Sequence, residues 1–314
     1  MDNKNYNLAF VFPGQGSQSV GMLTELAQAY PSVKQTFARA SEILGKDLWQ
    51  LVTNGSAEDL NLTYNTQPAM LTAGVAIWQV WCERSKLRPS WMAGHSLGEY
   101  TALVCSEAML FDDAVALVAE RGALMQEAVP AGEGAMAAII GLQEPQVISV
   151  CNKSAQEQVV SAVNFNAPGQ VVIAGHATAV ERAMIAAKEA GAKRAVKLPV
   201  SAPSHCSLME TAATKLAERL QNVSIESPNV TLIHNVDVAS HNSPEVIRNA
   251  LEEQLFKPVR WVDTIKFMHE QGVNKFVECG PGKVLMGLNK RTAKDAEHFT
   301  IYDTDTLNKV LEQL

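Results

Sequence analysis

The stretch Trp91-Met92-Ala93-Gly94-His95-Ser96-Leu97-Gly98 decides the fold. Its first three residues are apolar and predict a buried strand, and the residues from Glu99 onward predict a helix. A Gly-x-Ser-x-Gly turn between a strand and a helix is the pattern of a nucleophile elbow, which holds the serine hydroxyl at the carboxyl end of a sheet. Glycines two residues on either side remove Cβ atoms that would clash in so tight a turn. The sequence therefore predicts an α/β fold with Ser96 as a nucleophile for acyl transfer.

Further apolar runs predict the rest of a parallel sheet. Residues 8–12 form a continuous apolar run, which suits a strand buried on both faces. Residues 230–234 and 275–279 predict two more strands. Helical patterns lie between them at residues 66–81, 99–129, 243–255 and 261–271, and the second of these breaks near Asp112, which we expect to cap a new helix.

Residues 132–199 have a different pattern. Strands are predicted at 135–142, 159–165, 170–174 and 195–198, with helices at 145–155 and 177–190. This β-α-β-β-α-β order is that of a ferredoxin-like α+β unit. We therefore predict a discontinuous α/β core, residues 1–131 and 200–314, interrupted by a small subdomain at residues 132–199.

Composition excludes several classes of protein. The formal net charge of −7 disfavours a broad surface for nucleic acid or anionic membrane, because phosphate contacts need clustered Lys and Arg. No stretch approaches the roughly 20 apolar residues of a membrane span, and the polar start of the chain is unlike a signal peptide, so we expect a cytoplasmic protein. Five scattered cysteines predict free thiols and no structural zinc.

The serine needs a base and an oxyanion hole. His95 adjoins Ser96, but neighbouring side chains diverge in this turn, so we expect it to pack locally. His205 lies where the chain re-enters the core, and a domain junction is where clefts form. No carboxylate has an obvious route to this histidine, which leaves the orienting group open. The backbone N–H groups of Leu97 and of Gln15, in a glycine-flanked turn after the first strand, are the candidate oxyanion donors.

Arg121 lies on the apolar face of its helix. It is four residues after Leu117 and four before Met125, so it shares the side that these residues bury. A guanidinium keeps its charge and needs an anionic partner when buried. That partner is either an internal carboxylate or a substrate carboxylate, or else the side chain reaches outward to solvent. A substrate partner would select an acyl group with a free carboxyl at its far end.

Several segments together resemble one family, the malonyl-CoA:acyl carrier protein transacylases of type II fatty acid synthesis. The resemblance runs in order over nearly the whole chain, as far as Gly280-Pro281-Gly282. Each motif alone is weakly specific, whereas the joint pattern is highly specific. The segments are Phe12-Pro13-Gly14-Gln15-Gly16-Ser17-Gln18, Gly94-His95-Ser96-Leu97-Gly98-Glu99, Arg121 with Gly122 and Met125, Asn164-x-Asn166-x-Pro168-Gly169-Gln170, and Ser204-His205.

The resemblance implies a fold and a set of catalytic roles. The fold would be a hydrolase-like parallel-sheet core with an inserted ferredoxin-like subdomain. Ser96 would carry the malonyl group, His205 would be its base, and the N–H groups of Gln15 and Leu97 would form the oxyanion hole. The backbone carbonyl of Gln254 would orient His205 in place of an aspartate. Such a histidine is less strongly polarised and is therefore a poorer activator of water.

The resemblance also implies substrate contacts and partners. Arg121 would bind the malonyl carboxylate, and Asn164 and Asn166 would line the cleft near the pantetheine arm. The remaining substrate-binding positions would be Met125, His95 and Ser204. The substrates would be malonyl-CoA and the 4′-phosphopantetheine thiol of acyl carrier protein, with no metal or bound redox cofactor.

Some questions stay open at this point. An acidic carrier protein needs a basic patch, for which Arg194, Lys290, Arg291 and Lys294 are candidates, although a solvated charged face explains them equally well. We expect a monomer. The rival functions are a transferase with another extender such as methylmalonyl, a serine hydrolase on the same elbow, and a non-catalytic carrier-binding subunit.

Overall fold

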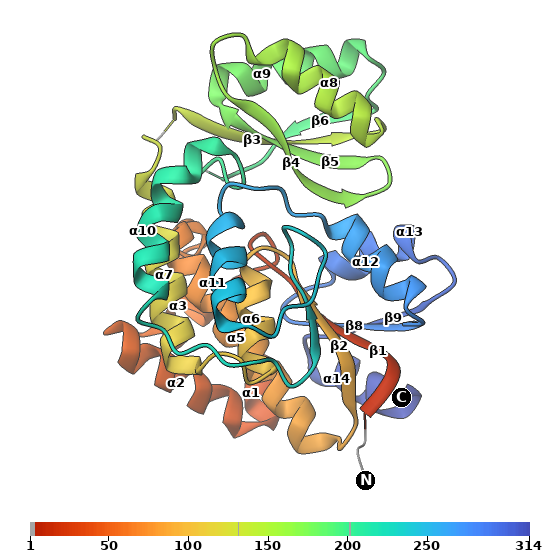
Figure 1. Ribbon diagram of the computed structural model, residues 1–314. Coiled ribbons are helices and arrows are strands. Elements are labelled where there is room, and N and C mark those ends of the chain that lie inside the picture. Colours follow the sequence, from red (N-terminus) through yellow and green to blue (C-terminus); the bar gives the residue numbers. More distant parts are fainter. Residues whose placement is uncertain (1–3, 131, 201) are drawn as a thin grey trace.

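The strand β1 (Lys4–Phe12) lies at the centre of the larger sheet in a computed structural model that describes residues 4–130, 132–200 and 202–314 (Figure 1). The sheet has five strands in the order β7-β2-β1-β8-β9, and every neighbouring pair is parallel. The other strands are β2 (Arg88–Gly94), β7 (Thr231–Ile233), β8 (Lys275–Cys279) and β9 (Glu297–Ile301). The α/β prediction is confirmed.

Both faces of this sheet are covered, as the apolar run of β1 predicts. Leu8, Phe10 and Phe12 belong to one hydrophobic cluster, and Ala9 and Val11 belong to another. The first cluster is built with α2 (Pro31–Leu44), α5 (Thr63–Arg84), α6 (Leu97–Cys105) and α7 (Phe111–Glu127), and the second with α12 (Trp261–Glu270) and α13 (Val284–Thr292). The remaining core helices are α1 (Thr24–Ala29), α3 (Leu48–Asn54), α4 (Ala57–Asn61), α10 (Glu210–Leu220), α11 (Pro244–Glu253) and α14 (Thr304–Gln313).

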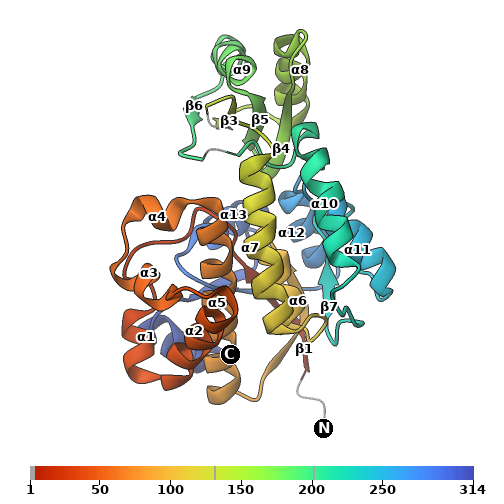
Figure 2. The ribbon, with the colours of Figure 1, turned by 90° about the vertical axis from the view of Figure 1, so that its left-hand side faces the viewer.

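The inserted unit forms its own antiparallel sheet, at the top of Figure 1, in the order β4-β5-β3-β6. Its strands are β3 (Gly134–Ile140), β4 (Val160–Ala167), β5 (Gln170–His176) and β6 (Arg194–Lys197), with α8 (Glu144–Ala155) and α9 (Ala177–Glu189) packed on one face. This order is ferredoxin-like, as predicted. Figure 2 shows the unit standing above the ends of α7 and α10.

Backbone hydrogen bonds connect the insert to the core at Val259. The N–H of Val259 donates to the carbonyl of Val163, and the N–H of Phe165 donates to the carbonyl of Val259. The chain segment before α12 thus extends the β4 edge of the small sheet. The insert and the core therefore meet beside the carboxyl ends of the core strands.

The structure differs from the sequence predictions in several elements. The edge strand β9 and the helices α3, α4, α10, α13 and α14 were not predicted. The helix α7 begins at Phe111 with Leu110 as its N-cap residue, so the expectation that Asp112 caps it is wrong. Asp112 instead lies in the first turn and pairs with Arg39. The predicted domain limit at residue 131 lies outside the described residues. Nowhere in the described ranges is a helix long and apolar enough to cross a bilayer.

Candidate active site

The nucleophile turn lies between the end of β2 and the start of α6. Ser96 has φ 52° and ψ −110°, a strained conformation for a residue with a side chain. A Cβ on Gly94 would lie 1.9 Å from the carbonyl carbon of Gly98, and a Cβ on Gly98 would lie 2.0 Å from the Phe12 oxygen. The turn therefore tolerates only glycine at both positions, which is the physical basis of the pattern seen in the sequence.

Two buried amide side chains hold the strained turn. The N–H of Ser96 donates to Oδ1 of Asn235 at 2.7 Å, and Nδ2 of Asn235 donates to the Gly94 carbonyl at 2.6 Å. On the other side, Nε2 of Gln254 donates to the Ser96 carbonyl at 3.0 Å. Sequence reasoning missed Asn235, because a lone asparagine after a strand carries no signal for a contact this distant in the chain.

His205 lies within hydrogen-bonding distance of the Ser96 hydroxyl. Its Nε2 lies 2.8 Å from Oγ of Ser96, and its Nδ1 lies 2.6 Å from the backbone carbonyl of Gln254. A carbonyl only accepts, so Nδ1 carries the proton and Nε2 is free to accept the serine proton. Burial, reinforced by the positive charge of Arg121, lowers the pKa of His205 to about 3. The imidazole is therefore neutral and ready to act as a base at physiological pH.

The backbone carbonyl of Gln254 takes the position next to His205 where a carboxylate was sought in the sequence. A buried carboxylate, that of Glu99, contacts the side chain of the same glutamine. Glu99 is fully buried and accepts from Nδ1 of His234 at 2.7 Å, from the N–H of Asn235 at 3.0 Å and from Nε2 of Gln254 at 2.8 Å. Three donors satisfy this charge without a direct contact to His205. Glu99 thus anchors both amides that hold the nucleophile turn.

Arg121 is buried, with 1% of its surface exposed. Its Nη1 donates to Oε1 of Gln67 at 2.8 Å, and its Nη2 donates to Oε1 of Gln254 at 3.0 Å and reaches Oγ of Ser96 at 3.4 Å. Within the described ranges no carboxylate forms an ion pair with this guanidinium. The internal ion pair considered for Arg121 is therefore not formed, and the charge faces the nucleophile.

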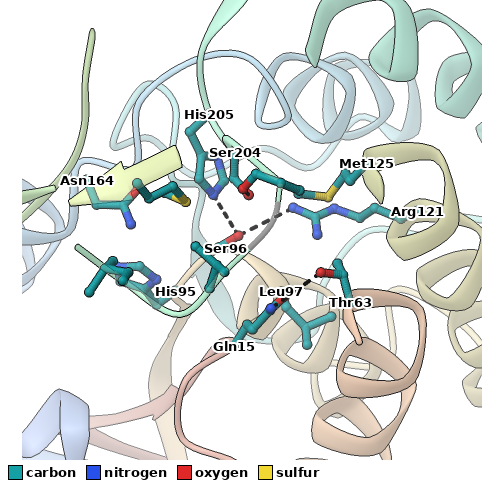
Figure 3. Close-up of a pocket in the computed structure, with 14 residues that line it drawn as sticks. Gln15, Thr63, His95, Ser96, Leu97, Arg121, Met125, Asn164, Ser204 and His205 are labelled. Atoms are coloured by element: carbon teal, nitrogen blue, oxygen red, sulfur yellow. Dashed lines mark hydrogen bonds between the residues drawn. The ribbon is translucent and has the colours of Figure 1, made fainter. Parts of the chain in front are cut away.

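The two candidate oxyanion donors lie on the same side of Ser96 (Figure 3). Leu97 is the first residue of α6, where the N–H has no partner within the helix and the helix dipole favours negative charge. The loop that carries Gln15 passes close to the elbow, since a Cβ on Gly14 would lie 2.4 Å from the His95 carbonyl oxygen. Leu97 and Gln15 both line the cavity over Ser96.

A cavity of about 100 Å³ opens over these groups, between the core and the insert. Met125, His95, Asn164 and Ser204 line it, as expected. Asn166 does not line it, and its Oδ1 instead lies 2.8 Å from Nε2 of His95. The wall also includes residues that sequence reasoning missed, which are Thr63, Met136, Leu198, Val200 and Ala202. In the part of the chain that the structure describes, no group of three or more His, Cys, Asp or Glu side chains is placed to hold a metal ion.

A serine hydrogen-bonded to a neutral histidine, beside two oxyanion donors, is suited to acyl transfer. Comparison with protein families gives the same result, because the family described as acyl transferase domain matches residues 9–305. The chain belongs to the acyl transferase family. Ser96 and His205 both lie within the matched residues.

Individual acyl transferases resemble this one over almost their full length. The malonyl CoA-acyl carrier protein transacylase of Escherichia coli K12 is 57% identical over 304 residues, which are 97% of this chain and 98% of that protein. The solved structure of the malonyl CoA-acyl carrier protein transacylase of Coxiella burnetii is 52% identical with a TM-score of 0.97, covering 98% of both chains. A malonyl-transacylase in complex with its type II PKS acyl-carrier protein is 55% identical with a TM-score of 0.97, covering 98% of this chain and all of that one.

Proposed function

We propose that this acyl transferase moves a malonyl group from malonyl-CoA to the phosphopantetheine thiol of acyl carrier protein, supplying the extender unit for fatty acid synthesis. The observation that carries the proposal is Arg121, a buried guanidinium that faces Ser96 without a carboxylate partner among the described residues. A free carboxylate on the acyl group completes that pair. The names of the close relatives support the same donor and acceptor.

The geometry accommodates a two-step cycle. Oγ of Ser96 attacks the malonyl thioester while its proton passes to Nε2 of His205. The N–H groups of Gln15 and Leu97 hold the oxyanion, which collapses to malonyl-serine, and His205 protonates the departing coenzyme A sulfur. The pantetheine thiol then loses its proton to His205 and attacks the malonyl-serine. The second tetrahedral intermediate collapses to the malonyl thioester of the carrier protein, and the departing Oγ of Ser96 takes its proton back from Nε2 of His205.

Three further points belong to the proposal. The orientation of His205 by a carbonyl rather than a carboxylate favours transfer over hydrolysis, because the less polarised imidazole is a weaker activator of water.

The insert, with limits at residues 132 and 199, acts as one wall of the cleft, where Asn164 has a buried Oδ1 without a partner among the described residues. A cytoplasmic location agrees with five free cysteines.

Intact-mass spectrometry tests the proposed function. Mixing with malonyl-CoA should add one malonyl group to the wild-type chain, and later addition of carrier protein should remove it. Ser96→Ala should remain unmodified. An unmodified wild-type chain would contradict the proposal, and loss of the adduct to water at the same rate with or without carrier protein would favour the hydrolase.

A further inference from the structure

Arg121 is held by two side-chain amides rather than by a carboxylate. Oε1 of Gln67, on α5, accepts from Nη1 at 2.8 Å, and Oε1 of Gln254, just after α11, accepts from Nη2 at 3.0 Å. Both glutamines are buried, with 1% and 0% of their surface exposed. A neutral amide oxygen satisfies a guanidinium N–H but leaves its charge uncompensated.

The orientation of each amide is determined by what its nitrogen contacts. Nε2 of Gln254 donates to Glu99 at 2.8 Å and to the Ser96 carbonyl at 3.0 Å, and both of these groups only accept. Nε2 of Gln67 lies 3.4 Å from the sulfur of Met125, a weak acceptor. With the nitrogen atoms engaged in this way, each amide presents its oxygen to Arg121.

The nearest negative charge to Arg121 on this side is separated from it by the amide of Gln254. The carboxylate of Glu99 contacts Gln254 rather than Arg121, so the guanidinium has a nearby negative charge but no direct ion pair. Burial lowers the pKa of Arg121, and Tyr100 and, to a smaller extent, the charge of Glu99 oppose that effect. A carboxylate in direct contact would instead occupy the fork that the substrate needs, and the substrate would have to displace it.

We propose that Gln67 and the side chain of Gln254 are specificity-determining positioning residues, which hold Arg121 in place through neutral oxygens so that its charge stays available to a carboxylate on the acyl donor. This inference rests on the proposed function. It adds to the role of Gln254, whose backbone carbonyl orients His205, a separate role for its amide. It assigns Gln67 a role that no motif in the sequence indicated.

The test is Gln67→Glu, which keeps the shape and places a carboxylate on Nη1 of Arg121. The measured quantity is the ratio of kcat/KM for malonyl-CoA to kcat/KM for acetyl-CoA. This ratio does not depend on the fraction of folded enzyme, so a merely structural defect leaves it unchanged. We expect the ratio to fall at least about tenfold in Gln67→Glu, the effect of about 1.4 kcal/mol. Gln67→Met, which removes an anchor without adding charge, should lower it less.

A matched control is Gln79→Glu, the same substitution three turns further along α5. Gln79 is exposed and accepts from Thr36 through its Oε1, which a carboxylate also does. The ratio should stay at its wild-type value there. If Gln67→Glu cannot be obtained folded, the same ratio is measured for Gln254→Glu. This variant retains the backbone carbonyl that His205 uses and places a carboxylate on Nη2 of Arg121.

The outcomes separate this inference from the proposed function. A wild-type chain without preference for malonyl over acetyl contradicts the proposed function. A wild-type preference that persists within twofold in the glutamate variants at positions 67 and 254 overturns only the role of the amides. A loss that is equal in Gln67→Glu and Gln67→Met also overturns it, because charge would then be irrelevant.

Discussion

The charge of Arg121 lies next to the nucleophile, so we propose that it decides which acyl donors Ser96 accepts. The serine hydroxyl is a nucleophile suited to any thioester, whereas we propose that the guanidinium of Arg121, whose Nη2 lies 3.4 Å from Oγ of Ser96, distinguishes acyl donors by their far end. Malonyl and acetyl thioesters present the same carbonyl to Ser96 and differ only in the carboxylate. The proposed selectivity therefore depends on the charge of Arg121 and on the amides that hold it in place.

Replacement of Arg121 by alanine should abolish that selectivity. A buried charge-assisted pair is worth about 3 kcal/mol, so kcat/KM for malonyl-CoA should fall roughly a hundredfold. Acetyl transfer does not use the guanidinium charge and should fall far less. Steady-state kinetics with both coenzyme A esters checks this, and equal losses for the two donors would contradict a carboxylate-binding role.

The pH dependence of acylation should reflect the lowered pKa of His205. The imidazole must be neutral to accept the serine proton, so acylation is lost only as the pH falls through this pKa of about 3. The rate constant for malonyl-serine formation should stay level between about pH 5 and pH 8. Rapid-quench mass spectrometry at several pH values measures it. A midpoint near the ordinary histidine value of 6.5 would show that the ring is solvated.

At the residue scale, sequence reasoning named the side chains that the structure brings together around Ser96 and missed most of the groups that hold them there. Ser96, His205 and Arg121 stand in recognisable local patterns. Asn235 and Gln67 do not, because the role of an amide depends on which atoms the fold brings to it. Glu99 lay inside the elbow motif, but its three donors come from other parts of the chain.

Among the elements, the junction of β2 and α6 is the least tolerant of change. A Cβ at position 94 would lie 1.9 Å from backbone atoms of Gly98, so Gly94→Ala forces the elbow itself to move. We expect a loss of about 3 kcal/mol or more in the free energy of unfolding, together with loss of acylation. Urea denaturation and the acylation rate constant measure the two effects.

Gly287→Ala is the matched control for that change. Gly287 lies within α13 and has no atom within 4 Å of an added Cβ. Alanine favours a helix over glycine, so stability should rise by up to about 1 kcal/mol with acylation unchanged. A similar loss in both variants would mean that the tight contacts of Gly94 are irrelevant.

The elements themselves were predictable to different degrees. Buried strands such as β1 are continuous apolar runs and stand out in the sequence. The strand β9 has one buried residue, Ile301, and begins with Glu297 and His298 at the edge of the sheet, so its pattern is weak. The start of α7 was misplaced because Asp112 suits the first turn of a helix as well as its cap.

The whole molecule is acidic, with a formal net charge of −7, and we propose that it receives an acidic carrier protein on a local basic surface. Lys290 and Arg291 lie exposed in the last turn of α13, and Lys294 follows them. Lys290→Glu should slow transfer from preformed malonyl-enzyme to carrier protein by roughly fivefold at low salt, and added salt should reduce the difference.

The first half-reaction separates docking from chemistry in that experiment. Acylation by malonyl-CoA should be unchanged in Lys290→Glu, because the residue does not line the cavity over Ser96. Lys188→Glu makes the same charge change on α9, at the outer end of the insert (Figure 1), and should leave both half-reactions unchanged. Equal slowing by the two variants would indicate a response to net charge alone.

The hydrogen bonds that hold the Ser96 turn make the nucleophile depend on residues that are synthesised much later. The two amides that clamp the turn come from residues 139 and 158 positions later in the chain. A ribosome that has released only the first 230 residues has made the nucleophile but neither clamp, and a strained turn without partners relaxes. We therefore expect the reactive geometry of Ser96 to form only after residues 235 and 254 have been synthesised.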